Sequence, residues 1–327
     1  MPEVLRPTTP SPSPTITPSE RPLRLSRGIN MGNTLEAPRD GSWGYRLQAA
    51  YFQRIAEAGF DHVRQPIRWS DYAAKELPYT IEPEFFQQVD WVVEQCTSRN
   101  LAVILDMHHY LEIMENPEAH RERFLALWRQ IAAHYQDSPD TVLFELLNEP
   151  NGALNAMLWN DYLAEAIAII RQTNPSRVII IGPTEWNSHA ALVTLKLPEN
   201  DPHLLVTFHY YQPFSFTHQG AEWVNGSASW LGTTWQGTPA EQEAIRFDLD
   251  VAARWARQNG RKLLLGEFGA YEKADMASRA RWTAFVAREA EARGIAWCYW
   301  EFGAGFGAYD RIERKWNEPL LRALIPE

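Results

Sequence analysis

Eight short apolar runs, each followed by a stretch with helical periodicity, constrain this chain more than any other feature. The runs are mostly continuous in their apolar character, which is typical of strands that are covered on both faces. Alternating strands and helices over about 300 residues predict an α/β fold, a single-domain (β/α)8 barrel of the TIM type. The runs lie at residues 25–33, 62–69, 102–109, 142–150, 177–183, 204–211, 262–269 and 297–303.

A doubly wound open sheet is the competing fold. It would usually carry a Gly-rich fingerprint after its first strand. The stretch "RGINMGN" has two glycines without that spacing, and the sequence has no P-loop motif. We therefore favour the barrel, in which polar groups with a chemical function lie at the carboxyl ends of the strands.

The helical stretches carry their own start and stop signals. Thr238 and Glu241 have the spacing of a capping box, Pro239 suits the first helical position, and Gly260 suits the end. This pattern predicts a helix between residues 238 and 260. Similar patterns predict helices at 83–100 and 277–294.

Composition excludes some functions. A net charge of −10 argues against electrostatic binding of nucleic acid and makes a polyanionic substrate unfavourable. The 14 tryptophans exceed what packing usually needs, which indicates a ligand with flat apolar faces. We interpret Cys96 and Cys298 as buried free thiols rather than a disulfide. No apolar run reaches the roughly 18 residues of a membrane-spanning helix.

Most of the predicted strands end on polar or aromatic side chains. Buried polar groups need partners, and at one rim of a barrel these side chains would be partners for one another. The residues at the strand ends are Asn33, Glu36, Arg64, His108, His109, Asn148, Glu149, Glu185, Trp186, His209, Tyr211, Glu267 and Trp300.

Two of these residues, Glu149 and Glu267, follow buried strands 118 positions apart. Two carboxyl groups that flank one bond are the arrangement that glycoside hydrolysis requires, one protonated and the other ionised. Arg64 could pair with Glu267 and keep it anionic, while Tyr211 could hold it in place. Asn148 could bind a sugar hydroxyl, and His108 and His209 would complete the polar floor.

Other interpretations of the same residues stay open. "NEP" after a strand can be a plain turn, and Glu267 can belong to a structural ion pair. The pair His108–His109 could suggest a metal, but neighbours on a strand point to opposite faces, so we predict no metal site. Four tryptophans in apparent loops could stack on sugar rings: Trp43, Trp223, Trp230 and Trp235.

These residues resemble a known family. From about residue 25 to 322 the chain is similar to glycoside hydrolase family 5, the cellulase and mannanase family of clan A. Five stretches carry the resemblance: "LNEP" and "GEFG" for the acid/base and nucleophile, "VRQPIRW", "DMHHY", and residues 209–224, "HYYQPFSFTHQGAEWV". The last resembles a subgroup of thermophilic bacterial endoglucanases that also accept mannan.

The resemblance implies a retaining mechanism with Glu149 as acid/base and Glu267 as nucleophile, and no cofactor. It implies that the two carboxyl groups lie about 5–5.5 Å apart. It also implies that the substrate is bound by Asn33, Glu36, Arg64, His108, His109, Asn148, His209, Tyr211, His218, Trp223 and Trp300.

We therefore expect an endo-β-1,4-glucanase that also cleaves glucomannan or mannan. A dedicated mannanase or xyloglucanase is the alternative within the same chemistry. A non-catalytic glycan-binding barrel would keep the aromatic residues but could dispense with one glutamate. A phosphate-handling isomerase is a further alternative, because "GAGFGA" at 303–308 is Gly-rich. We expect this segment instead to be a flexible loop beside the glycan cleft.

Residues 1–23 are rich in Pro, Thr and Ser and predict a disordered linker ahead of the catalytic domain, residues 24–327. Such linkers are common in secreted multimodular enzymes. We expect a secreted protein, although no signal segment opens the chain, and a carbohydrate-binding module upstream of the linker. The expected partner is a β-1,4-linked polysaccharide, with no nucleic acid and no membrane.

Overall fold

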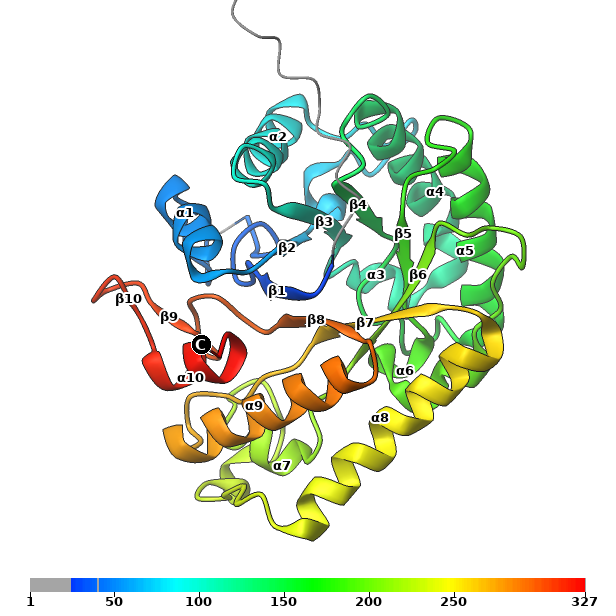
Figure 1. Ribbon diagram of the computed structural model, residues 1–327. Coiled ribbons are helices and arrows are strands. Elements are labelled where there is room, and N and C mark those ends of the chain that lie inside the picture. The colour runs from blue at the N-terminus through cyan, green and yellow to red at the C-terminus, as the bar shows by residue number, and fades with distance from the viewer. Residues whose placement is uncertain (1–24, 40, 327) are drawn as a thin grey trace, which may run out of the picture.

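The computed structural model describes residues 25–39 and 41–326. Eight strands form a closed barrel in chain order, with every neighbouring pair parallel and β8 paired to β1 (Figure 1). The predicted single-domain (β/α)8 barrel is therefore confirmed. Its strands are β1 (Arg27–Asn30), β2 (His62–Ile67), β3 (Ala102–Met107), β4 (Val142–Glu145), β5 (Ile179–Ile181), β6 (Leu204–His209), β7 (Lys262–Glu267) and β8 (Ala296–Tyr299).

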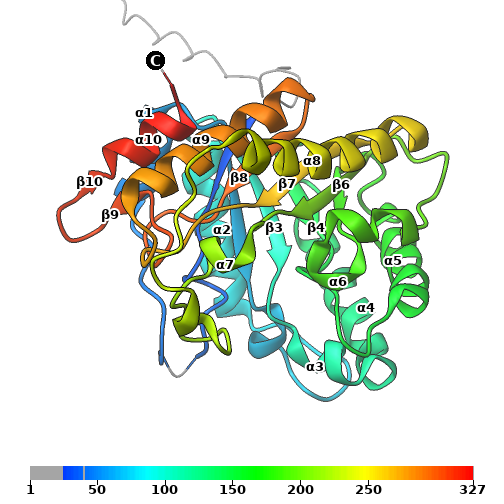
Figure 2. The same cartoon turned by 90° about the horizontal axis from the view of Figure 1, so that it is seen from below.

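Helices surround the barrel, and α9 and α10 lie side by side in both views (Figures 1 and 2). A small hairpin of β9 (Tyr309–Asp310) and β10 (Lys315–Trp316) precedes α10. The helices are α1 (Ala49–Ala58), α2 (Pro83–Thr97), α3 (Leu111–Glu115), α4 (Pro117–His134), α5 (Ala156–Arg171), α6 (Thr184–Asn187), α7 (Phe214–Thr217), α8 (Pro239–Asn259), α9 (Met276–Ala292) and α10 (Glu318–Leu324). Three 3-10 turns are η1 (Trp69–Tyr72), η2 (His189–Thr194) and η3 (Ser227–Trp230).

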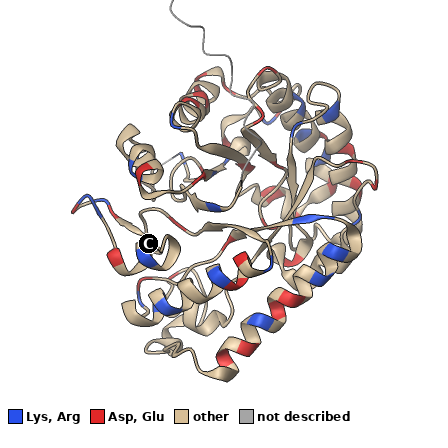
Figure 3. Ribbon diagram, in the orientation of Figure 1, with Lys and Arg blue, Asp and Glu red and all other residues tan. Residues whose placement is uncertain are grey.

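The helices that the sequence predicted are α2, α8 and α9. In α8 the capping box is complete, because Thr238 accepts from the Glu241 amide while the Glu241 side chain accepts from the Thr238 amide. Gly260 ends the helix with φ 60°, a conformation that glycine adopts easily. Lys and Arg alternate with Asp and Glu along α8 (Figure 3), as expected for a helix with one solvated face.

The barrel interior has an apolar layer with a polar layer above it. The apolar layer is built from inward-facing residues of β3 to β8: Ala102, Ile104, Leu143, Ile180, Leu205, Leu264 and Cys298. Two residues beyond Ile104 and Leu143, on the same face of their strands, come the fully buried Asp106 and Glu145. Polarity therefore rises toward the carboxyl ends of the strands, where a barrel places its chemistry.

Other expectations have different outcomes. Cys96 and Cys298 are both buried and free, as predicted. The predicted linker at residues 1–23 lies outside the described residues. Trp235 is not available as a sugar platform, because it packs against Phe285 with only 1% of its surface exposed. Within residues 25–39 and 41–326, no helix is both long and apolar enough to cross a membrane.

Candidate active site

The predicted site residues come together at the carboxyl ends of the barrel strands. Arg64 lies in β2, and Glu267 is the last residue of β7. His108 directly follows β3, Glu149 follows β4 by four residues, and His209 ends β6. Because all these strands are parallel, residues far apart in sequence meet at one rim.

Arg64 is the centre of this arrangement and is fully buried. Its Nε and Nη2 donate to Glu145 at 2.7 and 2.8 Å, and Nη1 donates to Glu267 Oε1 at 2.7 Å. It also donates to Asn30 Oδ1 at 2.9 Å and to Asn148 Oδ1 at 2.8 Å, and Asp106 lies 3.1 Å away. The planar guanidinium thus orients three carboxylates and two amides at once.

Glu267 is held by fixed donors on both oxygens. Arg64 occupies Oε1, and the Tyr211 hydroxyl donates to Oε2 at 2.9 Å. Burial raises the pKa of Glu267, while His209, Arg64 and the Tyr211 hydrogen bond oppose that rise. An adjacent cation and a hydroxyl donor both favour the ionised form of this carboxyl group.

Glu149 has a different environment. Its backbone is left-handed with φ 48°, and its side chain is 27% exposed, compared with 6% for Glu267. Its Oε1 lies 2.7 Å from His209 Nδ1. Burial raises the pKa of Glu149 to about 7, with Arg64 opposing this rise and Glu145 adding to it. The two glutamates therefore have the contrasting surroundings that separate an acid from an anion.

A carboxylate oxygen of Glu149, one of Glu267 and a nitrogen of His209 lie within 4.8 Å of one another. Among the described residues, this is the one cluster with a spacing that would suit a metal ion. Arg64, Tyr211 and His209 already satisfy these carboxylates, so the arrangement needs no cation to balance it. The short separation instead allows both carboxyl groups to reach a single bond.

Four rings form an aromatic row: Trp300, His108, His109 and Trp43. His108 Nδ1 lies 2.5 Å from Asp106 Oδ2, and its ring is parallel to Trp300 at 5.8 Å. The expectation that His108 and His109 point to opposite faces is wrong, because their ring centroids are only 4.4 Å apart. The physical reason is that β3 ends at Met107 and His109 turns back with φ 53°.

The row continues to the loop after β1. Trp43, which is 39% exposed, contacts His109 edge-on at 6.0 Å. A Cβ atom on Gly32 would lie 2.8 Å from the Trp300 ring, so the glycine makes room for the indole. Sugar rings stack on such partly exposed aromatic faces.

Asn33 and Glu36 lie beside this row but differ in access. Glu36 is 1% exposed, and its carboxylate accepts from the backbone amides of Asn33 and Thr34. Burial raises the pKa of Glu36 to about 8 against these backbone hydrogen bonds. The geometry thus gives Glu36 a role in shaping the turn that presents Asn33, which has φ 60°.

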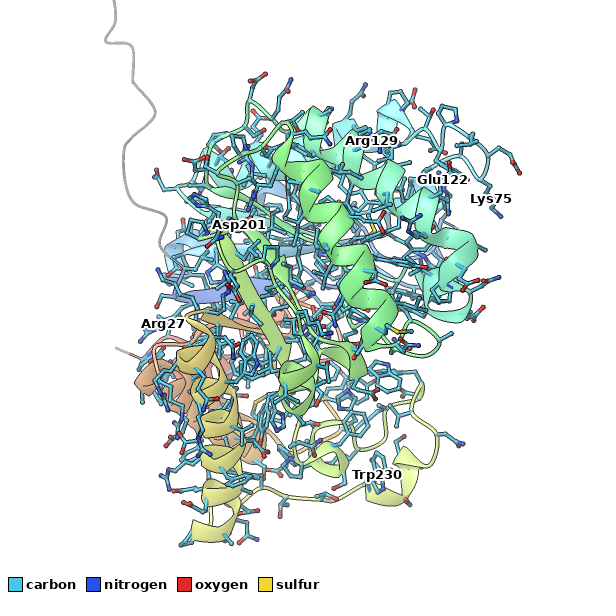
Figure 4. All side chains as sticks on the ribbon, turned by 90° about the vertical axis from the view of Figure 1, so that its right-hand side faces the viewer. Arg27, Lys75, Glu122, Arg129, Asp201 and Trp230 are labelled. Atoms are coloured by element: carbon cyan, nitrogen blue, oxygen red, sulfur yellow. The ribbon has the colours of Figure 1, made fainter. Side chains whose placement is uncertain are left out.

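His218 and Trp223 belong to a second group of aromatic side chains, in the long connection after β6. The His218 ring is 4.9 Å from Tyr211 and stacks on Phe214 at 4.0 Å. Trp223 is 61% exposed and meets Tyr271 edge-on at 4.9 Å. In Figure 4, Trp230, from the same connection, lies near the lower edge of the molecule, away from Asp201, which precedes β6.

The loop at 303–308 differs from the expectation of an open, flexible segment. The buried Glu301 carboxylate accepts from the amides of Gly303 and Ala304 at 2.7 Å and from Phe306 at 3.3 Å. Phe306 and Ala308 are buried. The backbone amides that could bind a phosphate are already used by a carboxylate of the protein itself, which removes the support for a phosphate site.

Sequence reasoning missed several residues of the site. Asn30, Asp106 and Glu145 are fully buried around Arg64 and were hidden inside apolar runs. The alternation of strand residues could have revealed Asp106, because it shares a face with His108 two positions later. Trp186 was noted at a strand end but not assigned to the site; it is 56% exposed, and its backbone amide donates to Pro150.

Comparisons with known proteins relate this chain to cellulases. The family model described as cellulase, glycosyl hydrolase family 5, matches residues 26–305. Endoglucanase H of Acetivibrio thermocellus is 37% identical over 97% of this chain, which spans only 35% of that protein's length. Endoglucanase B of Clostridium cellulovorans is 29% identical over 91% of this chain and 73% of its own length.

Solved structures of related proteins share this fold. Cel5A of Thermotoga maritima, in complex with mannotriose substrate, is 50% identical with a TM-score of 0.90. That match covers 92% of this chain and 97% of the other. The cellulose synthase subunit Z of Clostridioides difficile is 42% identical with a TM-score of 0.90, covering 92% of this chain and all of that one.

Proposed function

The chain belongs to the cellulase family, glycosyl hydrolase family 5, and we propose that it is a retaining endo-β-1,4-glucanase with Glu149 as acid/base and Glu267 as nucleophile. One observation carries this proposal: oxygens of Glu149 and Glu267 lie within 4.8 Å of each other, in contrasting surroundings. Retaining glycosidases hold their carboxyl groups about 5–5.5 Å apart, whereas inverting enzymes need about 6.5–9.5 Å to admit a water.

In the proposed reaction, Glu267 attacks the anomeric carbon while Glu149 gives its proton to the departing glycosidic oxygen. A covalent glycosyl–enzyme forms, and a sugar leaves. Glu149, now ionised, then takes a proton from water, which attacks the same carbon and releases Glu267. Arg64 and Tyr211 hold Glu267 in its attacking position throughout.

We propose that the aromatic and polar residues around the two glutamates bind the polysaccharide. The row of Trp300, His108 and His109 would hold sugars on one side of the cleaved bond, with Asn33 beside it and Glu36 behind Asn33. His218 and Trp223 would form a second aromatic surface, and Asn148 would contact a sugar hydroxyl next to Glu149. The exposed Trp186 adds a further apolar surface at the same rim.

The preferred substrate is β-1,4-glucan, with glucomannan or mannan as the alternative. The endoglucanase relatives support glucan, while the mannotriose complex of the Thermotoga protein supports mannan. We also propose that the protein acts outside the cell and that residues 1–23 link the barrel to a carbohydrate-binding module. The Pro/Thr/Ser-rich composition of those residues supports both proposals.

Glu149→Ala and Glu267→Ala distinguish the two roles. Glu267→Ala should lose about 10⁴-fold or more in kcat on carboxymethylcellulose and on an activated dinitrophenyl cellobioside, because both need the nucleophile. Glu149→Ala should lose about 10²–10⁴-fold on the polymer. It should still form the glycosyl–enzyme from the activated substrate, whose leaving group needs no proton, and should show a burst of dinitrophenol.

Glu272→Ala is the matched control, because Glu272 is an exposed acid five residues beyond Glu267. It should hydrolyse both substrates at the normal rate. Initial rates of the unchanged protein on carboxymethylcellulose, glucomannan, galactomannan and xyloglucan rank the substrates. Activity on galactomannan alone would refute the glucanase assignment, and normal turnover by Glu267→Ala would refute the mechanism.

A further inference from the structure

Three consecutive left-handed residues follow β5. Glu185, Trp186 and Asn187 have φ values of 58°, 55° and 55°. Residues other than glycine rarely adopt this conformation, and Asn tolerates it better than most. The first two side chains are exposed, but Asn187 is fully buried. A strained backbone that turns one amide into the interior suggests that this amide has a role there.

The Asn187 amide contacts the acid/base through one intermediate. Its Nδ2 lies 3.3 Å from His209 Nε2, and His209 Nδ1 lies 2.7 Å from Glu149 Oε1. An amide nitrogen only donates, so His209 Nε2 must accept. In a neutral imidazole the proton then lies on Nδ1, which donates to Glu149. Burial lowers the pKa of His209 to about 4, so the ring is neutral near pH 6.

Gly182 provides the space for this amide. A Cβ atom at position 182 would lie 2.1 Å from Asn187 Oδ1 and 2.8 Å from Nδ2. Oδ1 is buried without a hydrogen-bond partner in the described part of the chain. The side-chain hydrogen bond of Asn187 is therefore directed at His209, which argues against a merely structural role in closing the turn.

We propose that Asn187 is a positioning residue that fixes the tautomer of His209 and thereby sets the pH at which Glu149 loses its proton. This inference rests on the proposed acid/base role of Glu149. An Nδ1–H donor stabilises the ionised form of Glu149 and offsets part of the effect of its burial. The acid/base must exist in both forms during one turnover, so this hydrogen bond matters in the step that needs the base.

Several other ionisable groups face Glu149 and His209, and substitution at position 187 leaves them in place. They belong to or follow five of the barrel strands: Arg64 of β2, Asp106 of β3, His108 after β3, Glu145 of β4, Tyr211 after β6 and Glu267 of β7. Because their contributions stay constant, a change in the pH profile on substituting Asn187 reports the amide alone.

Asn187→Gly tests the proposal in the full chain. Glycine adopts φ 55° without strain, so folding should be preserved. Without the amide, His209 can carry its proton on Nε2 and Glu149 loses its donor. The basic limb of the kcat/KM profile on carboxymethylcellulose should then move upward by on the order of one pH unit, with little change at acidic pH. Asn100→Gly, also left-handed at φ 58° but exposed, is the matched control and should leave the profile unchanged.

Two measurements distinguish a loss of His209 positioning from a general disturbance of the site. The ¹⁵N shifts of the His209 ring should report Nδ1–H in the unchanged protein and a mixture of tautomers in Asn187→Gly. Gly182→Ala should displace the amide and move the basic limb in the same direction. It should have no additional effect when combined with Asn187→Gly, where the clash is absent.

An unchanged His209 tautomer in Asn187→Gly would overturn the proposal. A changed tautomer with an unmoved basic limb would overturn the link to Glu149. In that case the burst assay on Glu149→Ala shows whether the acid/base assignment itself has failed, because that assay does not depend on residue 187.

Discussion

Arg64 determines how the buried charges of this site can coexist. Asp106, Glu145 and Glu267 all lie within 3.1 Å of its guanidinium, and all three are buried. Burial raises the pKa of Asp106 to about 7 and raises the pKa of Glu145, while Arg64 opposes both. One cation thus supports several acids, which makes the site depend on the geometry of a single side chain.

Arg64→Lys should therefore not be a conservative change. Lysine keeps the charge but cannot donate in a planar fork to Glu145, Glu267 and the two amides together. We expect a loss of about 3 kcal/mol in unfolding free energy and at least about 100-fold in kcat. Urea unfolding and initial rates measure these effects. Arg54→Lys, in the exposed pair with Glu57, should change neither quantity, and equal effects from both variants would contradict the argument.

At the scale of elements, the sequence predicted the helices best. The start and end of α8 depend on Thr238, Glu241 and Gly260, which act locally and can be identified without knowing the rest of the fold. The strands were less well bounded. The apolar run at 142–150 continues past β4, which ends at Glu145, because the chain then turns toward the left-handed Glu149. Such a turn depends on tertiary contacts that sequence patterns do not contain.

Thr238→Ala should weaken α8 without affecting the site. The substitution removes the capping-box hydrogen bond from the Glu241 amide to the threonine hydroxyl, and the bond that this hydroxyl donates to the Glu241 carboxylate. Caps of this kind contribute about 1 kcal/mol. Thermal and urea unfolding should show the loss, while kcat on carboxymethylcellulose stays constant. Thr80→Ala, at an exposed position outside any helix, is the control. Unfolding curves that coincide for both variants would show that the cap contributes nothing.

At the scale of the whole molecule, the barrel explains why some of the site was predictable and some was not. Residues at or shortly after the ends of strands, such as Glu267 and Glu149, could be placed at one rim as soon as the fold was predicted. Glu145 could not, since its partner Arg64 is 81 residues away in sequence. The role of a buried acid inside an apolar run depends on a partner that is distant in sequence. Only the closed barrel brings the two side chains together.

The pH dependence of hydrolysis is a property of this whole rim. Glu267 must be ionised, so activity should fall as the pH drops through its pKa and the nucleophile takes up a proton. Glu149 must be protonated, and its pKa is about 7, so activity should fall again as the pH rises through about 7. We expect a bell-shaped kcat/KM profile on carboxymethylcellulose with its maximum below pH 7.

A second substrate shows which limb belongs to Glu149. The kcat/KM of dinitrophenyl cellobioside reports formation of the glycosyl–enzyme, and its leaving group needs no proton from the protein. The acidic limb should therefore remain on this substrate, because Glu267 still has to attack, whereas the basic limb should disappear or weaken strongly. If both substrates lose activity equally above pH 7, the loss reflects another group or unfolding, and Glu149 does not act as the acid that its contact with His209 suggests.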